Sequence, residues 1–449
     1  MKKERTLSMT EGSVTKALIL FAIPIFIGNL FQNLYNIVDT AIIGNVLGDT
    51  SLAAMGTVAP LYSIVISFLM GIANGFAIIL AQNYGAEDWK SFRKNMSLIY
   101  LLSVLIVGAL TILSQFALHP ILVMLHTPDE IIGQAESYMR IIICFSFVTM
   151  LYNMFAASLR AIGDSRTPLF FLMISSVLNG ILDVVFIKGC HMGVEGAAYA
   201  TVISQTVSVI LCFGYVWKKE RLIRFSYMDL AWDWDRIRDL LTSGISMSLM
   251  TVVFIGSVAL QSAVNSLGNT IITAHTAARK IHDVIALPIG TVSTSVATFV
   301  GQNMGKKDYE RIYEGLKKGL FLVTCWCAFA AFLAFEFGRQ AIWLLTGTDN
   351  EEVVRNAYFY LRVNSLFYFS LGGFMTIRST IQGMGRKLVP ILSSMSELVL
   401  KFAAVPLIVG VLGYFGVCIL EPITWTVGMT IVAVDFLLLK RRIQTGYSK

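Results

Sequence analysis

One carboxylate interrupts the first apolar stretch of this 449-residue chain. Asp39 is the only side chain charged at neutral pH between residues 17 and 44. On a helix, spacings of three and four place it on one face with several uncharged polar residues, which are Asn29, Gln32, Asn33, Asn36 and Thr40. A charge in a segment long enough to cross a bilayer is costly and usually marks an ion or substrate path. Asp39 is therefore the first candidate functional residue, and Asn33 and Asn36 are candidates for lining a cavity beside it.

A second carboxylate of the same kind is Asp183, which shares a helix face with Asn179. Asp39 and Asp183 each precede the outer end of an apolar run by five residues, which places both about 7–8 Å below that end. Thr201 falls at a similar depth on the next run. Two carboxylates close together in a low dielectric cannot both stay ionised at little cost, so such a pair is expected to bind and release a proton.

The oxygens of Asp39 and Asp183, with those of Asn179 and Thr201, would alternatively hold Na⁺ in a partial cage. The remaining alternative is that each aspartate only caps or pairs within its helix bundle.

The elements that position these residues are predicted to be membrane-spanning helices. Hydrophobic residues make up 56% of the chain and charged residues 14%, and the mean hydropathy is +0.70. Runs of about 20 apolar residues, each sufficient to cross a bilayer, follow one another through the chain. Twelve are expected, at residues 14–44, 51–81, 96–118, 133–159, 167–187, 194–217, 237–264, 271–301, 314–337, 353–379, 388–411 and 415–439. The fold class is an all-α polytopic membrane protein.

The net charge of +7 indicates the orientation of the chain in the membrane and not nucleic-acid binding. Of the 35 Lys and Arg residues, 27 lie in alternate connections and at the two termini. Such a bias indicates loops that stay in the cytoplasm. We therefore expect both termini in the cytoplasm, a location in the cytoplasmic (inner) membrane, the lipid bilayer as surroundings and no nucleic-acid partner.

An internal duplication divides the chain into two halves. Gln82-Asn83-Tyr84-Gly85 recurs 220 positions later as Gln302-Asn303-Met304-Gly305, and Tyr138-Met139-Arg140 recurs as Tyr360-Leu361-Arg362 after 222 positions. Several landmarks at one shift indicate a structural repeat. The predicted lobes are residues 1–217 and 237–449, each of six helices, joined by a cytoplasmic linker at 218–236. Parallel repeats of this kind build some secondary transporters, in which the lobes rock around a central site.

The second half carries its own intramembrane charges. Spacings of four pair Arg279 with Asp283, and Glu397 with Lys401. Glu421 lies 220 positions after Thr201 and is a second-rank candidate for carrying a proton. Such pairs either neutralise each other and fix helix packing, or line the cavity and relay a protonation state. Gln261 adds an uncharged polar group to the seventh run.

The combined pattern resembles the multidrug and toxic compound extrusion (MATE) family over essentially the whole chain. The duplicated Gln-Asn-x-Gly motifs, Asp39, the segment Ala161-Ile162-Gly163-Asp164 leading to Pro168, and Asn179 with Asp183 carry the likeness. The resemblance implies twelve helices in two lobes and export of bulky, often cationic, organic compounds driven by H⁺ or Na⁺ entry. It also implies that Asp39, Asn179, Asp183 and Thr201 form a cation site in the first lobe.

Pro24 matches the position where the first helix of the branch with paired aspartates bends. Independently, a proline inside a helix removes a backbone hydrogen bond and kinks the helix. The chain departs from family members that hold a cation with acids on helices seven and ten, because no carboxylate occurs at the corresponding places. The positive charges of the second half also argue against assuming a cationic substrate.

We therefore expect an H⁺-coupled antiporter for organic compounds, with Na⁺ as the less favoured ion and a monomeric state. No cofactor beyond the coupling ion is expected, and a nucleotide-binding loop is absent from the sequence. The alternative is a flippase for a lipid-linked saccharide precursor, and a channel or receptor is a third class. An enzyme is not expected, since no nucleophile–base set stands out.

Overall fold

The computed structural model describes residues 7–125, 127–250, 253–348 and 350–444, and these residues form helices and connections without a strand. Helices of the first repeat are α1 (Val14–Leu47), α2 (Asp49–Gly85), α3 (Trp89–Met124), α4 (Asp129–Cys144), α5 (Ser146–Ala161), α6 (Arg166–Asp183) with the π-helix η1 (Val184–Gly189), and α7 (Val194–Lys219). Two 3₁₀ turns, η2 (Arg221–Ile223) and η3 (Tyr227–Asp229), come next.

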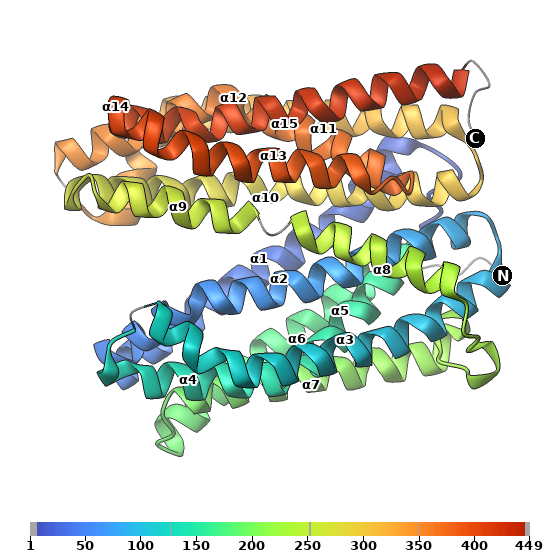
Figure 1. Ribbon diagram of the computed structural model, residues 1–449, viewed down its shortest axis with the longest axis horizontal. Coiled ribbons are helices and arrows are strands. Elements are labelled where there is room, and N and C mark those ends of the chain that lie inside the picture. The colour runs from blue at the N-terminus through green and yellow to red at the C-terminus, as the bar shows by residue number, and fades with distance from the viewer. Residues whose placement is uncertain (1–6, 126, 251–252, 349, 445–449) are drawn as a thin grey trace. The chain divides into compact units, whose positions relative to one another are not determined.

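Helices of the second repeat are α8 (Trp234–Leu249), α9 (Val253–Asn265), α10 (Asn269–Gly305), α11 (Tyr309–Thr346), α12 (Glu351–Gly383), α13 (Leu388–Ala404) with the π-helix η5 (Val405–Val409) and the short α14 (Gly410–Leu412), and α15 (Tyr414–Gln444) (Figure 1). α4 and α5 meet at a bend of 48° and form one broken span. Counting α4 with α5, α6 with η1, α8 with α9, and α13 with η5 and α14 gives twelve segments, in agreement with the twelve predicted runs.

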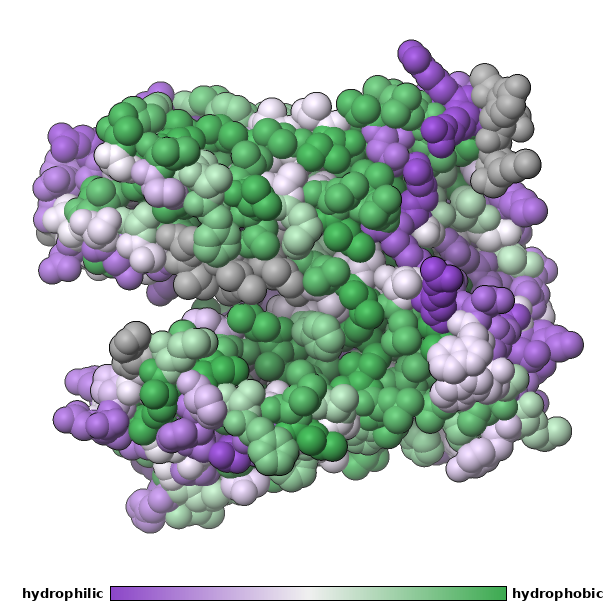
Figure 2. Space-filling view, viewed as in Figure 1, coloured by the Kyte–Doolittle hydropathy of each residue, from purple (hydrophilic) through white to green (hydrophobic). Residues whose placement is uncertain are grey.

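The segments have the length and apolarity of membrane helices. Within the described residues nine helices are long and apolar enough to cross a membrane, or ten when α4 and α5 count as one span. Figure 2 shows hydrophobic residues over the middle of the helices and hydrophilic residues at the helix ends. This distribution suits a chain whose helices lie in a bilayer and whose connections lie in water.

The backbone repeats as closely as the sequence motifs do. α2 and α10 both contain 37 residues and both start after a glycine with positive φ, Gly48 (φ 82°) and Gly268 (φ 95°). The carboxylates of Asp88 and Asp308 cap α3 and α11 by accepting hydrogen bonds from backbone N–H groups three residues on. The π-helices η1 and η5 occur at corresponding points, after α6 and α13. The duplication is therefore a structural repeat.

The described chain forms two compact units. Unit 1 contains Leu7 and residues 23–248, and unit 2 contains residues 8–22 and 249–444. The lobes predicted from the internal duplication are residues 1–217 and 237–449, and the compact units differ from them at two places. Residues 8–22, the start of α1, belong to unit 2, whereas α8 belongs to unit 1. Unit 1 thus includes the first helix of the second repeat, and unit 2 includes the start of the first helix of the first repeat.

Close backbone contacts explain why α8 packs in unit 1. A Cβ atom added to Gly75 of α2 would lie 2.4 Å from the carbonyl oxygen of Ser243 and 2.5 Å from Cα of Gly244. The hydroxyl of Ser243 donates to the carbonyl oxygen of Gly75 at 2.8 Å. Only a helix surface without side chains permits so close an approach.

The side chains of Arg311 and Asn303 fix the segment before α1 in unit 2. The guanidinium of Arg311 donates three hydrogen bonds to backbone carbonyls of this segment, at 3.2 Å to Met9, 2.8 Å to Glu11 and 3.0 Å to Gly12. Asn303 of the repeated motif adds a fourth, from Nδ2 to the carbonyl oxygen of Met9 at 3.0 Å. The boundary between the units then falls inside α1, one residue before Pro24.

Candidate functional site

The structure brings the carboxyl groups of Asp39 and Asp183 together inside unit 1. Asp39 lies in α1, and Asp183 is the last residue of α6, directly before the π-helix η1. Their exposed fractions are 8% and 0%, and the two carboxyl groups lie close enough to interact directly. Two ionised carboxylates at short range repel each other, whereas a proton on one of them would let the two groups form a hydrogen bond.

Four acceptor oxygens of this cluster lack a donor. Among the described residues, no N–H or hydroxyl group donates to Oδ1 of Asp39, to Oδ1 or Oδ2 of Asp183, or to Oδ1 of Asn179. A buried acceptor left without a donor costs about 1–3 kcal/mol, and more when it is charged. A proton shared by the carboxyl groups, or a cation bound by the oxygens, removes this cost. We call Asp39, Asn179, Asp183 and Thr201 the carboxylate cluster.

Thr201 of α7 ties the cluster to α1 through a residue that sequence reasoning missed. The side-chain amide of Asn179 donates to Oγ1 of Thr201 at 3.5 Å, and the hydroxyls of Thr201 and Tyr35 lie 2.8 Å apart. Tyr35 precedes Asp39 by four residues and shares its helix face, which is the signal that could have found it. A hydrogen-bonded path therefore runs from α6 through α7 to α1.

Two cavities of unit 1 adjoin Tyr35. The first, the carboxylate cavity, has an empty volume of about 1030 Å³ and is lined by Tyr35, Asn36, Asp39, Thr40, Leu52, Met55, Gly56, Val58, Ala59, Tyr62, Ser63 and Tyr138. The second, the Arg160 cavity, has an empty volume of about 930 Å³. It is lined by Pro24, Ile25, Gly28, Asn29, Gln32, Tyr35, Tyr62, Ile66, Met70, Thr149, Tyr152, Asn153, Ala156, Arg160, Ser165, Pro168, Leu169, Leu172, Ser175, Gln205 and Ser208.

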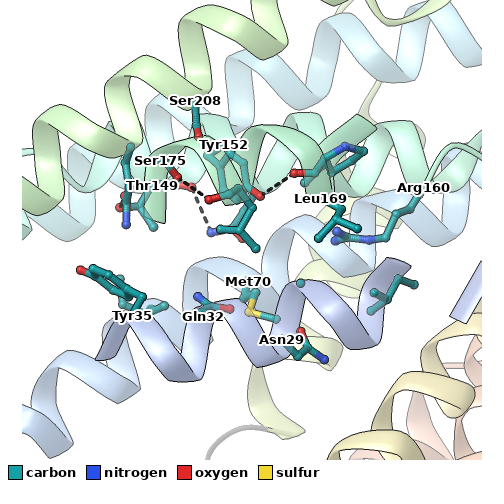
Figure 3. Close-up of a pocket in the computed structure, with 18 of the residues that line it drawn as sticks. Asn29, Gln32, Tyr35, Met70, Thr149, Tyr152, Arg160, Leu169, Ser175 and Ser208 are labelled. Carbon is teal, nitrogen blue, oxygen red and sulfur yellow. Dashed lines mark hydrogen bonds between the residues drawn. The ribbon is translucent and has the colours of Figure 1, made fainter. Parts of the chain in front are cut away.

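Tyr35 and Tyr62 line both cavities, so the two cavities share part of their walls. Figure 3 shows the Arg160 cavity between α1 and the helices α5 to α7, with Tyr35 and Arg160 at opposite ends of the view. Pro24, predicted as a hinge, lies in the wall of this cavity.

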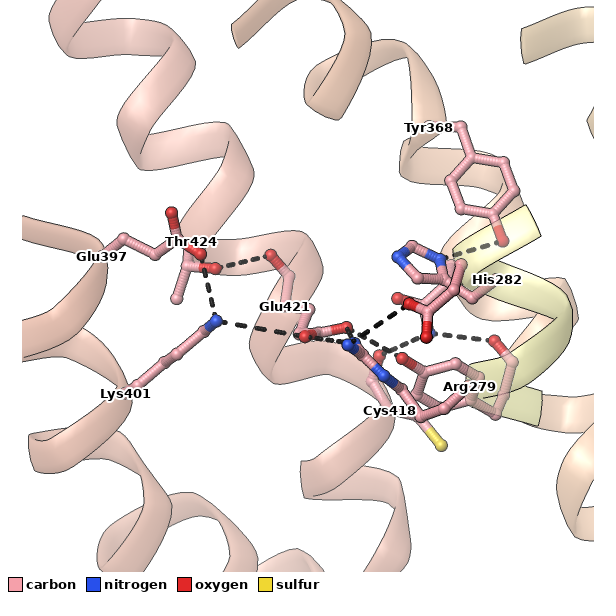
Figure 4. Close-up of polar contacts among 11 residues, drawn as sticks. Arg279, His282, Tyr368, Glu397, Lys401, Cys418, Glu421 and Thr424 are labelled. Carbon is pink, nitrogen blue, oxygen red and sulfur yellow. Dashed lines mark hydrogen bonds and ion pairs between the residues drawn. The ribbon is translucent and has the colours of Figure 1, made fainter. Parts of the chain in front are cut away.

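The charged residues of the second half form an ion-pair network inside unit 2 (Figure 4). Nη1 of Arg279 contacts both carboxylate oxygens of Glu421, at 2.6 and 2.8 Å. Asp283 lies 3.6 Å from Arg279, and Nζ of Lys401 lies 3.0 Å from Glu397 and 4.0 Å from Glu421. Both predicted pairs at spacing four are therefore present, and Glu421 joins them.

The contacts of Glu421 favour its charged form. Besides Arg279 and Lys401, the hydroxyl of Tyr360 donates to Oε2 of Glu421 at 2.8 Å. Two cations and a hydrogen bond stabilise an ionised carboxylate. The role of Glu421 as a proton carrier stays a prediction, and this arrangement does not favour it.

The repeat places this network where unit 1 has its carboxylate cluster. Lys401 lies 222 positions after Asn179, and Glu421 lies 220 positions after Thr201. A cation–carboxylate contact in unit 2 thus replaces the neutral contact between Asn179 and Thr201 in unit 1. At these two equivalent positions unit 2 carries a lysine and a glutamate, whereas unit 1 carries an uncharged amide and a hydroxyl.

The remaining predicted residues lie away from the two clusters or at their edges. Asn36 lines the carboxylate cavity beside Asp39, whereas Asn33 is exposed and lines neither cavity. Gln261 of α9 is exposed and donates from Nε2 to Oδ1 of Asn265 at 3.0 Å.

Comparisons with known proteins give the family. The MatE family model matches residues 24–185 and 244–407, one match in each repeat and together well over half of the chain. The chain belongs to the MATE family. It is 30% identical over 414 residues to the probable multidrug resistance protein YpnP of Bacillus subtilis, covering 91% of both chains. It is 25% identical to the multidrug export protein MepA of Staphylococcus saprophyticus, covering 95% of this chain and 93% of that protein.

Solved MATE structures share the fold. A crystal structure of MATE in the bent conformation has a TM-score of 0.89 and 23% sequence identity, covering 97% of both chains. The outward-facing conformation of a multidrug resistance MATE family transporter has a TM-score of 0.87 and 23% identity, covering 99% of both. The chain is therefore a multi-pass membrane transporter with the twelve-helix, two-repeat MATE fold, and the expected transporter class is confirmed.

Proposed function

We propose that this MATE protein is an antiporter that exports bulky organic compounds across the cytoplasmic membrane against an inward flow of H⁺. The carboxylate cluster of unit 1 loads the proton, and the substrate binds in the adjoining Arg160 cavity. The named relatives are multidrug resistance and multidrug export proteins, which supports export of organic compounds. No cofactor other than the coupling ion takes part, and the chain works as a monomer with both termini in the cytoplasm.

One observation carries this proposal: Asp39 and Asp183 are buried, touch each other and lack a counter-cation within the described chain. A structural pair of acids would be neutralised, as Glu421 is by Arg279 in unit 2. An acid pair that shares one proton instead changes its charge when that proton is lost. Such a pair is suited to loading a proton on one side of the membrane and releasing it on the other.

Proton binding is connected to substrate release through α1. Loading a proton from outside neutralises one carboxylate and removes the repulsion between Asp39 on α1 and Asp183 on α6. α1 then rearranges near Pro24, where the ring removes a backbone hydrogen bond and makes bending easier. Because Pro24 and Tyr35 both line the Arg160 cavity, this movement changes the cavity and lowers its affinity for substrate.

Ion entry supplies sufficient energy for export. Moving one elementary charge down a membrane potential of 100 mV yields about 2.3 kcal/mol, to which the concentration gradient of the ion adds. H⁺ is favoured over Na⁺ because a proton alone completes the hydrogen bond between the two carboxyl groups. Na⁺ needs several oxygen ligands, for which Asp39, Asp183 and Asn179 offer their donor-free oxygens.

Transport by the purified protein in liposomes, with ΔpH and ΔNa⁺ imposed separately, tests this assignment. The proposal expects ΔpH alone to drive uphill movement of an organic dye and ΔNa⁺ alone to have no effect. Transport driven only by ΔNa⁺ would leave the carboxylate cluster as the proposed ion site and show that the coupling ion is Na⁺ instead of H⁺. Transport driven by neither gradient would refute the antiport proposal.

A flippase for a lipid-linked saccharide precursor remains the alternative function. The hint in its favour is the positive charge of the second half, which would suit an anionic lipid in a broad groove. In unit 2, however, Arg279 and Lys401 are paired with carboxylates, so these cations are already neutralised.

A further inference from the structure

The Arg160 cavity has one formal charge in its wall, and that charge is positive. Its lining residues include amides, hydroxyls, aromatic rings and apolar side chains, but Arg160 is the only Lys, Arg, Asp or Glu among them. Asp39 lines the carboxylate cavity instead. A ligand in the Arg160 cavity therefore meets a cationic group and no carboxylate in the cavity wall.

Arg160 has no carboxylate partner within the described chain. Within the described residues its side chain makes one hydrogen bond, from Nη2 to Oδ1 of Asn74 at 3.2 Å, and an amide oxygen carries no charge to neutralise the guanidinium. Arg140 in the same unit is paired with Glu136 and Arg236 with Asp233. An unneutralised cation among membrane helices is costly and is usually retained for binding. Arg160 lies in the last turn of α5, where a basic residue could serve only to set the orientation of the helix in the membrane. Its guanidinium, however, lies in the cavity wall (Figure 3).

The rest of the wall suits a ligand with an apolar body and an anionic group. Ile66, Met70 and Leu172 supply apolar surface, and Met adapts to varied shapes. The hydroxyl of Thr149 donates to Oε1 of Gln205 at 2.7 Å, which turns the N–H groups of that amide to other acceptors. The guanidinium of Arg160 can recognise carboxylate or phosphate oxygens, because its N–H groups bind two oxygens at once.

We propose that the compounds exported by this protein are amphipathic organic anions or zwitterions, held in the Arg160 cavity by a carboxylate or phosphate group on Arg160. This substrate class rests on the proposed export function and makes it more specific. It differs from the expectation of a cationic substrate. Outward movement of an anion and inward movement of a proton both carry charge in the direction that an inside-negative membrane potential favours.

A matched pair of fluorescent probes tests the charge preference on the purified full-length protein in detergent. Dansylglycine carries a carboxylate, and dansylglycinamide is its neutral counterpart of nearly the same shape. The wild-type protein is expected to bind dansylglycine about tenfold more tightly, the factor typical of one charge-assisted hydrogen bond. Equal affinities, or failure of dansylglycine to bind at millimolar concentration, would overturn the proposal.

Two substitutions assign the preference to Arg160. Arg160→Gln removes the charge and is expected to abolish the difference between the probes, whereas Arg160→Lys should retain part of it. Arg166→Gln is the matched control, because Arg166 is exposed, lies outside the cavity and belongs to the same connection. A preference that survives Arg160→Gln, or is lost equally in Arg166→Gln, would contradict the assignment.

The binding measurement separates this inference from the proposed function, since it needs no ion gradient. ΔpH-driven transport of dansylglycinamide that persists in Arg160→Gln would leave the antiport mechanism in place. If the wild-type protein prefers the carboxylate probe but no gradient drives transport, the proposed function fails and the anion site stands.

Discussion

The hydroxyl of Tyr35 lies 2.8 Å from the hydroxyl of Thr201, although 166 positions separate the two residues in the sequence. This contact joins α1 to α7 next to the paired carboxyl groups of Asp39 and Asp183. Tyr35 also lines both cavities of unit 1. In the proposed mechanism, movement of α1 on proton loading would therefore also change the Arg160 cavity.

Tyr35→Phe keeps the ring and removes the hydroxyl. The loss of one hydrogen bond of about 0.5–1.5 kcal/mol should reduce ΔpH-driven transport a few-fold and shift the proton concentration for half-maximal transport. Transport rates measured against external pH in proteoliposomes check this. Tyr62→Phe is the control, because its ring lines the same two cavities and its hydroxyl bonds no described residue. Equal effects of both substitutions would contradict a specific role for the Tyr35 hydroxyl.

Glu421→Gln should destabilise unit 2, because it leaves the partly buried guanidinium of Arg279 without its closest counter-charge. We expect a loss of about 3 kcal/mol in the free energy of unfolding, at the low end for a broken buried pair because Asp283 stays 3.6 Å away. Adding Arg279→Met should restore most of the loss. Denaturant unfolding in mixed micelles measures both variants.

The control for this network is Arg339→Met, which breaks the exposed contact with Glu351 and should cost less than about 1 kcal/mol. If Glu421→Gln costs no more than this control, the network is not a structural ion pair.

Gly75→Ala should destabilise unit 1 by about 1–3 kcal/mol, since the new methyl group would meet the backbone of α8 at 2.4 to 2.6 Å. Gly108→Ala, at a helical glycine with nothing within 4 Å of the added Cβ, should be neutral or slightly stabilising. Thermal unfolding of the two variants in detergent gives the comparison. A similar effect of both would mean that α8 does not pack against α2 as described.

Asp88 stabilises the start of α3 to an extent that depends on pH. The backbone N–H of Ser91 bonds to its carboxylate and holds the pKa of Asp88 below its ordinary value. The stabilisation is therefore present above the ordinary pKa and is lost as the pH falls through the lower folded value. Below about pH 4 the first turn of α3 in the wild-type protein should become less protected against hydrogen exchange. In Asp88→Asn the asparagine should cap the helix without this pH dependence.

Hydrogen exchange at residues 89–95, corrected for intrinsic rates, measures this difference. Equal acid sensitivity in both proteins would show that Asp88 does not titrate at the cap.

Apolar length and repetition in the sequence predict much of the fold. Twelve spans, the duplicated motifs and the pairs Arg279–Asp283 and Glu397–Lys401 arise from periodicities that hold within single helices. The assignment of residues 8–22 to unit 2 and of α8 to unit 1 could not be predicted. It depends on the close backbone approach at Gly75 and on the hydrogen bonds from Arg311 to backbone carbonyls, and neither kind of contact produces a periodic pattern in the sequence.

Within the site, the equal depth of Asp39 and Asp183 on their helices suggests that the two residues meet. From the sequence, Arg160 indicates only that its connection lies in the cytoplasm. A sequence does not show whether an arginine at a helix end points to solvent or into a cavity.

The central claim is that the carboxyl groups of Asp39 and Asp183 carry the coupling proton, and ΔpH-driven transport by charge-neutral variants tests it most directly. Asp39→Asn and Asp183→Asn keep the side-chain size and should each reduce uphill transport at least about tenfold. Asp49→Asn, at an exposed aspartate that starts α2, should transport like the wild type. Wild-type transport by Asp39→Asn at normal expression would contradict the account.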